Sequence, residues 1–224
     1  MPHRIAIYDM DKTITRDPTW TRFLRHAVPR QAPLRALLWP AAALATLAYG
    51  ARLIDRAALK QMTQRLMLGQ ALPADRADAL AEGFADRLLA TGVLDGARAR
   101  IAEDRAAGYR LVMATASYAF YVGAIAARLG YDDVIATGSA RAPDGAVLAR
   151  IAGENCYGPA KLRMIEAWLA GQGIARGHAH VRFYSDHVSD APALDWADEA
   201  FAVNAHAPLR ALAAERGWTL LDWR

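Results

Sequence analysis

The chain has 224 residues, of which 54% are hydrophobic, and it carries a formal net charge of +4. This composition excludes an intrinsically disordered protein, and the absence of a long basic run argues against a nucleic-acid-binding groove. The single cysteine, Cys156, excludes an internal disulfide and fits a reducing compartment. Asp9 and Asp11 interrupt the N-terminal stretch before a long apolar run develops, so we expect a cytoplasmic protein without a signal peptide.

The first predicted element is a strand from about Arg4 to Tyr8, which ends directly before Asp9 and Asp11. In a parallel α/β sheet the functional site lies at the carboxyl ends of the strands. Two carboxylates around one turn can hold a hard cation there and divide nucleophilic and acid–base roles between them. A simple polar turn after an edge strand would have the same sequence pattern.

The next stretch, from Pro18 to Ala90, is predicted to be wholly helical and is rich in Ala, Leu and Arg. Breaks are expected at four places, near Pro29, Pro33, Gly50 and the Leu72–Pro73 pair. This helical block would form a small domain over the carboxyl ends of the strands.

Within this block, the segment from Ala36 to Ala51 has no charged residue and is bounded by Arg35 and Arg52. As a helix it would be about 24 Å long, shorter than the ~30 Å hydrocarbon core of a bilayer. We favour a buried hairpin of cap helices. The alternative is an apolar face that contacts the inner membrane peripherally, or a lipid-like substrate, with Trp39 and Tyr49 as interface anchors.

Beyond Gly92, helices alternate with strands, which predicts a doubly wound, mostly parallel α/β sheet. The core would comprise residues 1–17 and 91–224, and the helical cap residues 18–90. We expect helices over Asp95–Ala107, Tyr118–Leu129, Pro159–Ala170 and Pro208–Arg216; strands over Tyr109–Ala114, Val134–Ile135, Val181–Tyr184, Ala200–Val203 and Thr219–Leu221; and a hairpin-like turn at Pro143-Asp144-Gly145.

Two of these elements place residues that could bind an anion, one at the end of a strand and one in the first turn of a helix. Thr115, Ala116 and Ser117 lie between a strand and a helix, where a hydroxyl and free backbone N–H groups can bind an anion, or where Thr115 or Ser117 only caps the helix. Lys161 falls in a first helical turn, where the macrodipole disfavours a cation. Because only three of the 27 basic residues are lysines, we interpret Lys161 as the partner of an anion; the alternative is a solvated lysine with its stem along the helix.

The strand that ends at Tyr184 is followed by Asp186, His187, Ser189 and Asp190. Asp190 could cap the next helix, whereas Asp186 has no evident structural role. We expect His187 to be an exposed loop residue that tunes the local field.

Four motifs in this order match those of the haloacid dehalogenase superfamily: Asp9 with Asp11, then Thr115, then Lys161, then Asp186 with Asp190. From Arg4 to about Asp222 the chain resembles subfamily IB, the phosphoserine phosphatase-like group with a helical cap between the first two motifs. This resemblance implies a Rossmann-like core.

The resemblance also implies roles for these residues. Asp9 would be the nucleophile that forms an aspartyl-phosphate, and Asp11 the general acid–base. Thr115, Ala116 and Lys161 would bind the phosphoryl group. Mg²⁺ would be held by Asp9, the backbone carbonyl of Asp11 and Asp186, with Asp190 and Ser189 in supporting positions.

The expected function is that of a Mg²⁺-dependent phosphomonoesterase acting on a small phosphorylated metabolite or a lipid phosphate. The alternatives are a non-catalytic phosphate-binding regulatory protein and a phosphoserine phosphatase proper. Phosphoserine phosphatases carry a glutamate for the substrate amine shortly after the first motif, where this chain has Asp17 and Pro18. Their cap also supplies an arginine, for which Arg52, Arg56 and Arg65 are candidates.

Overall fold

The first strand of the chain is the central strand of the sheet. In the computed structural model, which describes residues 2–224, β1 (His3–Tyr8) lies between β3 (Arg110–Tyr118) and β6 (Ala179–Ser185) and is parallel to both. Beyond β3 lies β4 (Asp133–Arg141), and beyond β6 lie β7 (Glu199–Val203) and β8 (Thr219–Leu221), all parallel. Because later strands lie on both sides of β1, the crevice of the sheet opens at the carboxyl end of β1.

The edge of the sheet beyond β4 is antiparallel. β5 (Val147–Ala152) returns from β4 as a hairpin, and the predicted turn is present, with Gly145 at a φ of 85°. The short strand β2 (Ala71–Leu72) pairs with β5. The prediction of a wholly helical stretch is therefore wrong at β2, because the open edge of β5 offers backbone partners that a local pattern cannot reveal.

Helices cover both faces of the sheet. Successive residues of β1 point to opposite faces, so alternate residues pack against different helices. Ala6 and Tyr8 share one apolar cluster with α4 (Ala74–Thr91), α5 (Asp95–Ala106) and α6 (Ala119–Leu129). Ile5 and Ile7 share the other with α7 (Pro159–Gly171), α8 (Ala191–Trp196) and α9 (Ala207–Arg216). The predicted doubly wound, mostly parallel fold is confirmed.

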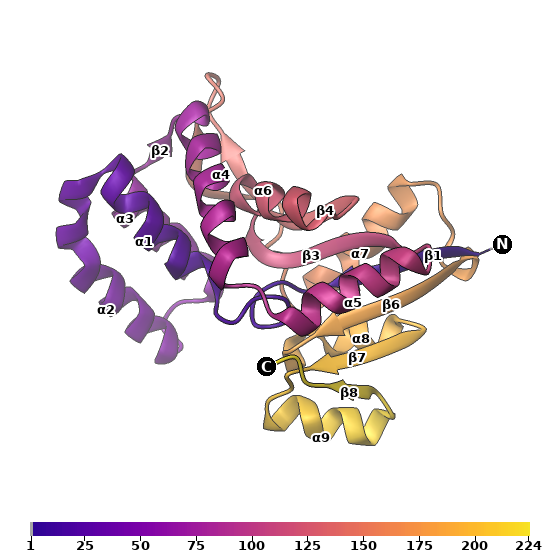
Figure 1. Ribbon diagram of the computed structural model, residues 1–224. Coiled ribbons are helices and arrows are strands. Elements are labelled where there is room, and N and C mark those ends of the chain that lie inside the picture. Colours follow the sequence, from indigo (N-terminus) through magenta and orange to yellow (C-terminus); the bar gives the residue numbers. More distant parts are fainter. Residues whose placement is uncertain (1) are drawn as a thin grey trace.

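The cap helices lie together beyond the carboxyl ends of the strands, on the left of Figure 1. They are α1 (Thr19–Gln31), the 3₁₀ helix η1 (Pro33–Leu38), α2 (Trp39–Gly50) and α3 (Arg56–Leu68). The next helix, α4, packs along α6 of the core. The division into a core of residues 1–17 and 91–224 and a cap of residues 18–90 stays a prediction, since α4 and β2 both join the core.

The favoured burial of the segment from Ala36 to Ala51 is wrong. Only Ala42 and Ala45 of α2 are buried, whereas Leu44 and Leu47 are 66% and 68% exposed. α2 packs mainly against α3 and η1. No helix within residues 2–224 is both long enough and apolar enough to cross a bilayer.

Candidate active site

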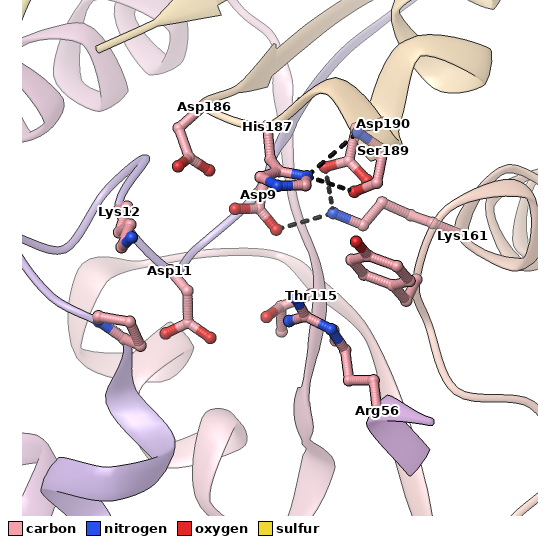
Figure 2. A pocket seen from close by; sticks show the side chains of 13 residues that line it. Asp9, Asp11, Lys12, Arg56, Thr115, Lys161, Asp186, His187, Ser189 and Asp190 are labelled. Atoms are coloured by element: carbon pink, nitrogen blue, oxygen red, sulfur yellow. Dashed lines mark hydrogen bonds and ion pairs between the residues drawn. The ribbon is translucent and has the colours of Figure 1, made fainter. Parts of the chain in front are cut away.

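A cavity of about 200 Å³ opens where β1, β3 and β6 end and α7 begins (Figure 2). It is lined by all eight residues predicted to be catalytic, phosphate-binding, metal-binding or supporting, Asp9, Asp11, Thr115, Ala116, Lys161, Asp186, Ser189 and Asp190, together with Lys12, Pro18, Arg56, Tyr157 and His187. These residues come from positions up to 181 apart in the chain, and the shared edge of a parallel sheet brings them together.

Ser117, also considered as an anion-binding or capping residue, is not among the lining residues and donates to Asp11.

A buried chain of charges runs across the floor of the cavity. Lys161 Nζ donates to Asp9 Oδ1 at 2.7 Å and to Asp190 Oδ2 at 2.6 Å, as Figure 2 shows. The Lys161 residue is only 2% exposed, although it lies in the first turn of α7. The carboxylates of Asp9 and Asp190 offset the unfavourable macrodipole at this position, in agreement with the interpretation that Lys161 pairs with an anion.

Burial and charge act on these groups in opposite directions. Burial raises the pKa of the Asp9 carboxyl, Lys161 lowers it, and Asp190 and Asp186 raise it again, so that the net shift is upward. Burial and the neighbouring Asp190 likewise raise the pKa of Asp186. Burial alone would lower the pKa of Lys161, but Asp190 and Asp9 hold it well above its usual value. The site therefore concentrates negative charge around one permanent ammonium.

Asp11 joins the core to the cap. Its Oδ1 accepts from the backbone N–H of Thr19 at 2.7 Å, and its Oδ2 accepts from Ser117 Oγ at 2.8 Å. Thr19 is the first residue of α1, and the residue before it, Pro18, makes no side-chain cap. Asp11 thus takes over the capping of α1 while its carboxylate lines the cavity.

The alternative that Thr115 or Ser117 caps the next helix is wrong. β3 continues past Ala114 to Tyr118, and α6 begins at Ala119 with no side-chain cap. The pairing of β3 with β4 shifts register between Thr115 and Tyr118, so the backbone bulges beside the cavity. The Ala116 carbonyl accepts from Thr137 Oγ1 and Lys60 Nζ, and Thr115 lines the cavity.

The loop after β6 is held by its own side chains. Ser185 Oγ donates to Asp190 Oδ2 at 2.7 Å, and the backbone N–H of Ser189 donates to His187 Nδ1 at 3.1 Å. Asp190 occupies the residue before α8 but makes no side-chain cap, so its structural alternative is wrong. His187 is half-buried rather than fully exposed, and its ring stacks on that of His206.

Thr13 is a site residue that sequence reasoning missed. Its Oγ1 lies 3.1 Å from Asp9 Oδ2 and 3.4 Å from Asp186 Oδ1, and it accepts from the backbone N–H of Asp186. The Thr13 hydroxyl therefore ties the loop after β1 to the loop after β6. The available signal was its place two residues after Asp11, on the same turn.

The donor set around Thr13 fits Mg²⁺. This ion commonly takes one or two carboxylates and keeps several waters, and the two carboxylates that share the Thr13 hydroxyl would supply such a pair. Within residues 2–224, no group of three or more Asp, Glu, His or Cys side chains is placed to hold a metal. The ligand set that the resemblance implies has two such side chains, Asp9 and Asp186, and its third protein ligand is the backbone carbonyl of Asp11.

Comparison with known proteins identifies the family. A model of the haloacid dehalogenase-like hydrolases matches residues 6–195, which include Asp9, Asp11, Thr115, Lys161, Asp186 and Asp190. The chain belongs to the haloacid dehalogenase-like hydrolases. The resemblance drawn from the four motifs is thereby confirmed.

Named relatives within this family include phosphatases. Phosphoserine phosphatase SerB1 of Mycobacterium tuberculosis is 32% identical over 146 residues, which make up 65% of this chain and 46% of that protein. The matched region thus spans about half the length of this haloacid dehalogenase-like relative. The match supports the phosphoserine phosphatase-like branch of the family.

Solved structures agree on the fold. A protein with unknown function from Bordetella pertussis Tohama I superposes with a TM-score of 0.88 at 27% identity, over 100% of both chains. A phospho-aspartyl intermediate analogue of phosphoserine phosphatase superposes with a TM-score of 0.65 at 17% identity, over 100% of this chain and 95% of the other. At that identity the second match bears on the fold alone.

The cap side of the cavity in this haloacid dehalogenase-like hydrolase is lined by some, but not all, of the residues considered for substrate recognition. Of the three candidate arginines, only Arg56 lines the cavity, where its guanidinium lies 4.2 Å from the centre of the Tyr157 ring. Asp17 is absent from the lining and lies 3.6 Å from Arg22 at the surface. Pro18 does line the cavity.

Lys12 takes an unusual backbone conformation at the rim. Its φ is 63°, in the left-handed region that favours glycine, and its carbonyl accepts from Asn204 Nδ2. A non-glycine residue in this region is strained and persists where its surroundings hold it. The strained turn keeps a second ammonium beside the cavity.

Proposed function

We propose that this protein is a Mg²⁺-dependent phosphomonoesterase that works through an aspartyl-phosphate on Asp9. The observation that carries the proposal is the buried Lys161, which pairs with Asp9 and Asp190 at the end of the central strand. A phosphoryl group entering this cavity would meet one fixed ammonium and one carboxylate nucleophile. Phosphoryl transfer depends mainly on such positioning and charge neutralisation.

The proposed reaction has two steps. In the first, a carboxylate oxygen of Asp9 attacks phosphorus, the bond from phosphorus to the ester oxygen breaks, and Asp11 gives a proton to the leaving oxygen. In the second, Asp11 takes a proton from a water molecule as that water attacks the aspartyl-phosphate, which releases phosphate and restores Asp9. Lys161 and the hydroxyl of Thr115 would hold the phosphoryl oxygens.

Mg²⁺ would be held by Asp9, Asp186 and the Asp11 backbone carbonyl, and it would neutralise charge between the phosphoryl group and Asp9. The Thr13 hydroxyl would keep both carboxylates facing each other. Asp190, through its contact with Lys161, would position the ammonium. The single, buried Cys156 supports a reducing location such as the cytoplasm.

The test of this function is hydrolysis of an aryl phosphate by the purified protein. We expect turnover that stops with chelator, returns with Mg²⁺, and is inhibited by Ca²⁺, which prefers more ligands and a looser geometry. Asp9→Asn is the control for contaminating phosphatases. Phosphate binding without turnover in the wild type would instead favour the regulatory alternative, and full activity in excess chelator would exclude the metal.

For the substrate, the cavity favours a leaving group that carries no ammonium. Every carboxylate in the lining, Asp9, Asp11, Asp186 and Asp190, already has a part in the proposed chemistry. An ammonium would therefore be desolvated without a partner, which is costly. Phosphoserine is thus expected to be a poor substrate, although a relative is named for it.

The cavity of about 200 Å³ has room for a phosphate and a small adjoining group, while acyl chains would have to lie outside it. We propose a small phosphomonoester or a lipid phosphate as the substrate, with Arg56 and Tyr157 facing the leaving group. The discriminating measurement compares kcat/KM for phosphoserine, an aryl phosphate and a lipid phosphate. A value for phosphoserine well above the other two would restore the phosphoserine phosphatase assignment.

A further inference from the structure

The outer face of η1 and α2 is apolar and open to solvent. Leu34 and Leu37 of η1 are 82% and 81% exposed, and Leu44 and Leu47 of α2 are exposed to a similar degree. Residues three apart share one side of either type of helix, so each pair points the same way. We call the surface formed by these four leucines and the neighbouring Leu53 the leucine face.

Most side chains of α2 are not buried in the described fold. α2 is apolar on all sides, a composition typical of a helix enclosed by apolar surroundings, yet its only buried residues are Ala42 and Ala45. Several large apolar side chains exposed within one short segment are unusual, and exposed apolar surface of this kind marks contact surfaces. The leucine face therefore calls for a partner.

Charge identifies the kind of partner. From residue 18 to residue 70 the chain has eight basic residues and one acidic residue, a net charge of +7 in a protein whose total is +4. The one acid, Asp55, is occupied in capping α3, where its Oδ1 accepts from the backbone N–H of Ala58. Arg25, Arg30 and Arg52 are exposed. The cap thus presents apolar side chains within a positively charged domain.

We propose that the leucine face docks on an anionic lipid bilayer, with α2 lying in the plane of the interface. An interfacial helix combines an inserted apolar side with basic residues that attract anionic lipids. Insertion across the bilayer is excluded by length, because a helix of 12 residues is about 18 Å long. A symmetric dimer through the same face would bring two domains of strong positive charge together, which disfavours a second copy as the occupant.

The docked orientation would bring the cavity close to the bilayer. Tyr49, near the end of α2, lies 5.9 Å from the guanidinium of Arg56, which in turn stacks on Tyr157 in the cavity wall. The leucine face and the cavity are therefore linked through Arg56. This proximity would let a lipid phosphate reach Asp9 with its acyl chains still in the membrane, a consequence that rests on the proposed function.

The docking itself is tested without turnover, using the Asp9→Asn chain and co-sedimentation with vesicles. Phosphatidylcholine vesicles with added phosphatidylglycerol should bind the protein, and vesicles of phosphatidylcholine alone should bind it much more weakly. The variant Leu37→Gln/Leu44→Gln/Leu47→Gln should lower partitioning by about 100-fold. Leu220→Gln, at an exposed leucine of β8, is the matched control and should leave partitioning unchanged.

Arg52→Gln should lower binding to the anionic vesicles by about fivefold and should do nothing to binding at high salt. The proposal fails if the triple variant, still folded by circular dichroism, binds as well as the parent chain, or if neither vesicle binds. It also fails if light scattering shows a dimer that the triple variant disperses. Because phosphatase activity is not measured, these failures are separate from failure of the proposed function.

Discussion

The cavity and the leucine face both depart from the usual pattern of buried apolar and exposed charged side chains, but in opposite ways. At the cavity, Asp9, Lys161 and Asp190 bury charge, whereas on α2 the side chains of Leu44 and Leu47 are left in water. Buried ions and exposed apolar patches are both informative departures from the common pattern. The buried ions are paired within the fold, but the leucines are not covered by it. Charge pairing in the first region is thus achieved within the fold, whereas the exposure of the second is the observation behind the proposed docking on a bilayer.

The largest expected effect is on catalysis at the cavity. Asp11→Asn should lower kcat/KM by on the order of 10²–10⁴, because an amide cannot exchange the proton of the leaving oxygen. The amide oxygen can still accept from the Thr19 N–H, so the entry to α1 should be kept. The loss should be smaller for nitrophenyl phosphate than for an alkyl phosphate, since nitrophenolate leaves without a proton. Equal losses on both substrates would show that Asp11 positions the reacting groups rather than giving a proton to the leaving oxygen.

The next effect tests whether the buried charges depend on one another. Lys161→Met should lower the free energy of unfolding by about 3–5 kcal/mol, because Asp9 and Asp190 would stay buried without their cation. Urea unfolding measures this loss. The double variant Lys161→Met/Asp190→Leu removes one of the stranded carboxylates and should recover part of the stability. No recovery would mean that packing, not charge, explains the first result.

A smaller effect concerns His26, on the buried side of α1. Burial, with Arg30 and Arg87, lowers the pKa of this imidazole from about 6.5 to about 4. The unfolded chain therefore binds a proton near its ordinary pKa while the folded chain does not, so His26 makes stability fall as the pH drops through this window. Between about pH 7 and about pH 5 this contribution is roughly 2 kcal/mol. The slope of unfolding free energy against pH should be shallower in His26→Phe, and an identical slope would contradict the assignment.

The smallest effect is expected at the leucine face. Leu47→Ala should change the free energy of unfolding by less than about 0.5 kcal/mol, because the side chain is already in water. Leu88→Ala, at a fully buried leucine of α4, should lower it by about 2–5 kcal/mol. Thermal or urea unfolding of the two variants gives the comparison directly. A loss above 2 kcal/mol in Leu47→Ala would show that the leucine face supports the monomer after all.

The sequence was sufficient to predict which core residues line the cavity. The end of a strand can be recognised from local sequence, and every parallel sheet brings the carboxyl ends of its strands to one edge. An apolar run before Asp9, and another before Asp186, place both carboxylates at one edge once the sheet is parallel. The same reasoning could not choose Arg56 from the three candidate arginines, nor find Tyr157, since their meeting depends on how the cap packs on the core. Nor could it find the extension of β3 through Thr115, where pairing with β4 overrides the local pattern.

Burial of the segment from Ala36 to Ala51 was mispredicted for a related reason. An uncharged, alanine- and leucine-rich helix has the same composition whether protein or something else covers it. Only the packing of α2 against α3 and η1 decides which side remains open. The net charge of residues 18–70 was visible in the sequence and would have favoured the exposed interpretation.

The two hydrogen bonds of Asp11 have a consequence for the timing of the reaction. One oxygen accepts from the first turn of α1 and the other from Ser117 of β3, so a single carboxylate joins the first cap helix to the core sheet. A carboxyl oxygen that takes up a proton becomes a donor and loses strength as an acceptor. With Asp11 as the proposed acid–base, each proton transfer would weaken one of these two hydrogen bonds and then restore it. The contact between α1 and β3 would then weaken and strengthen in step with the proton transfers of the reaction.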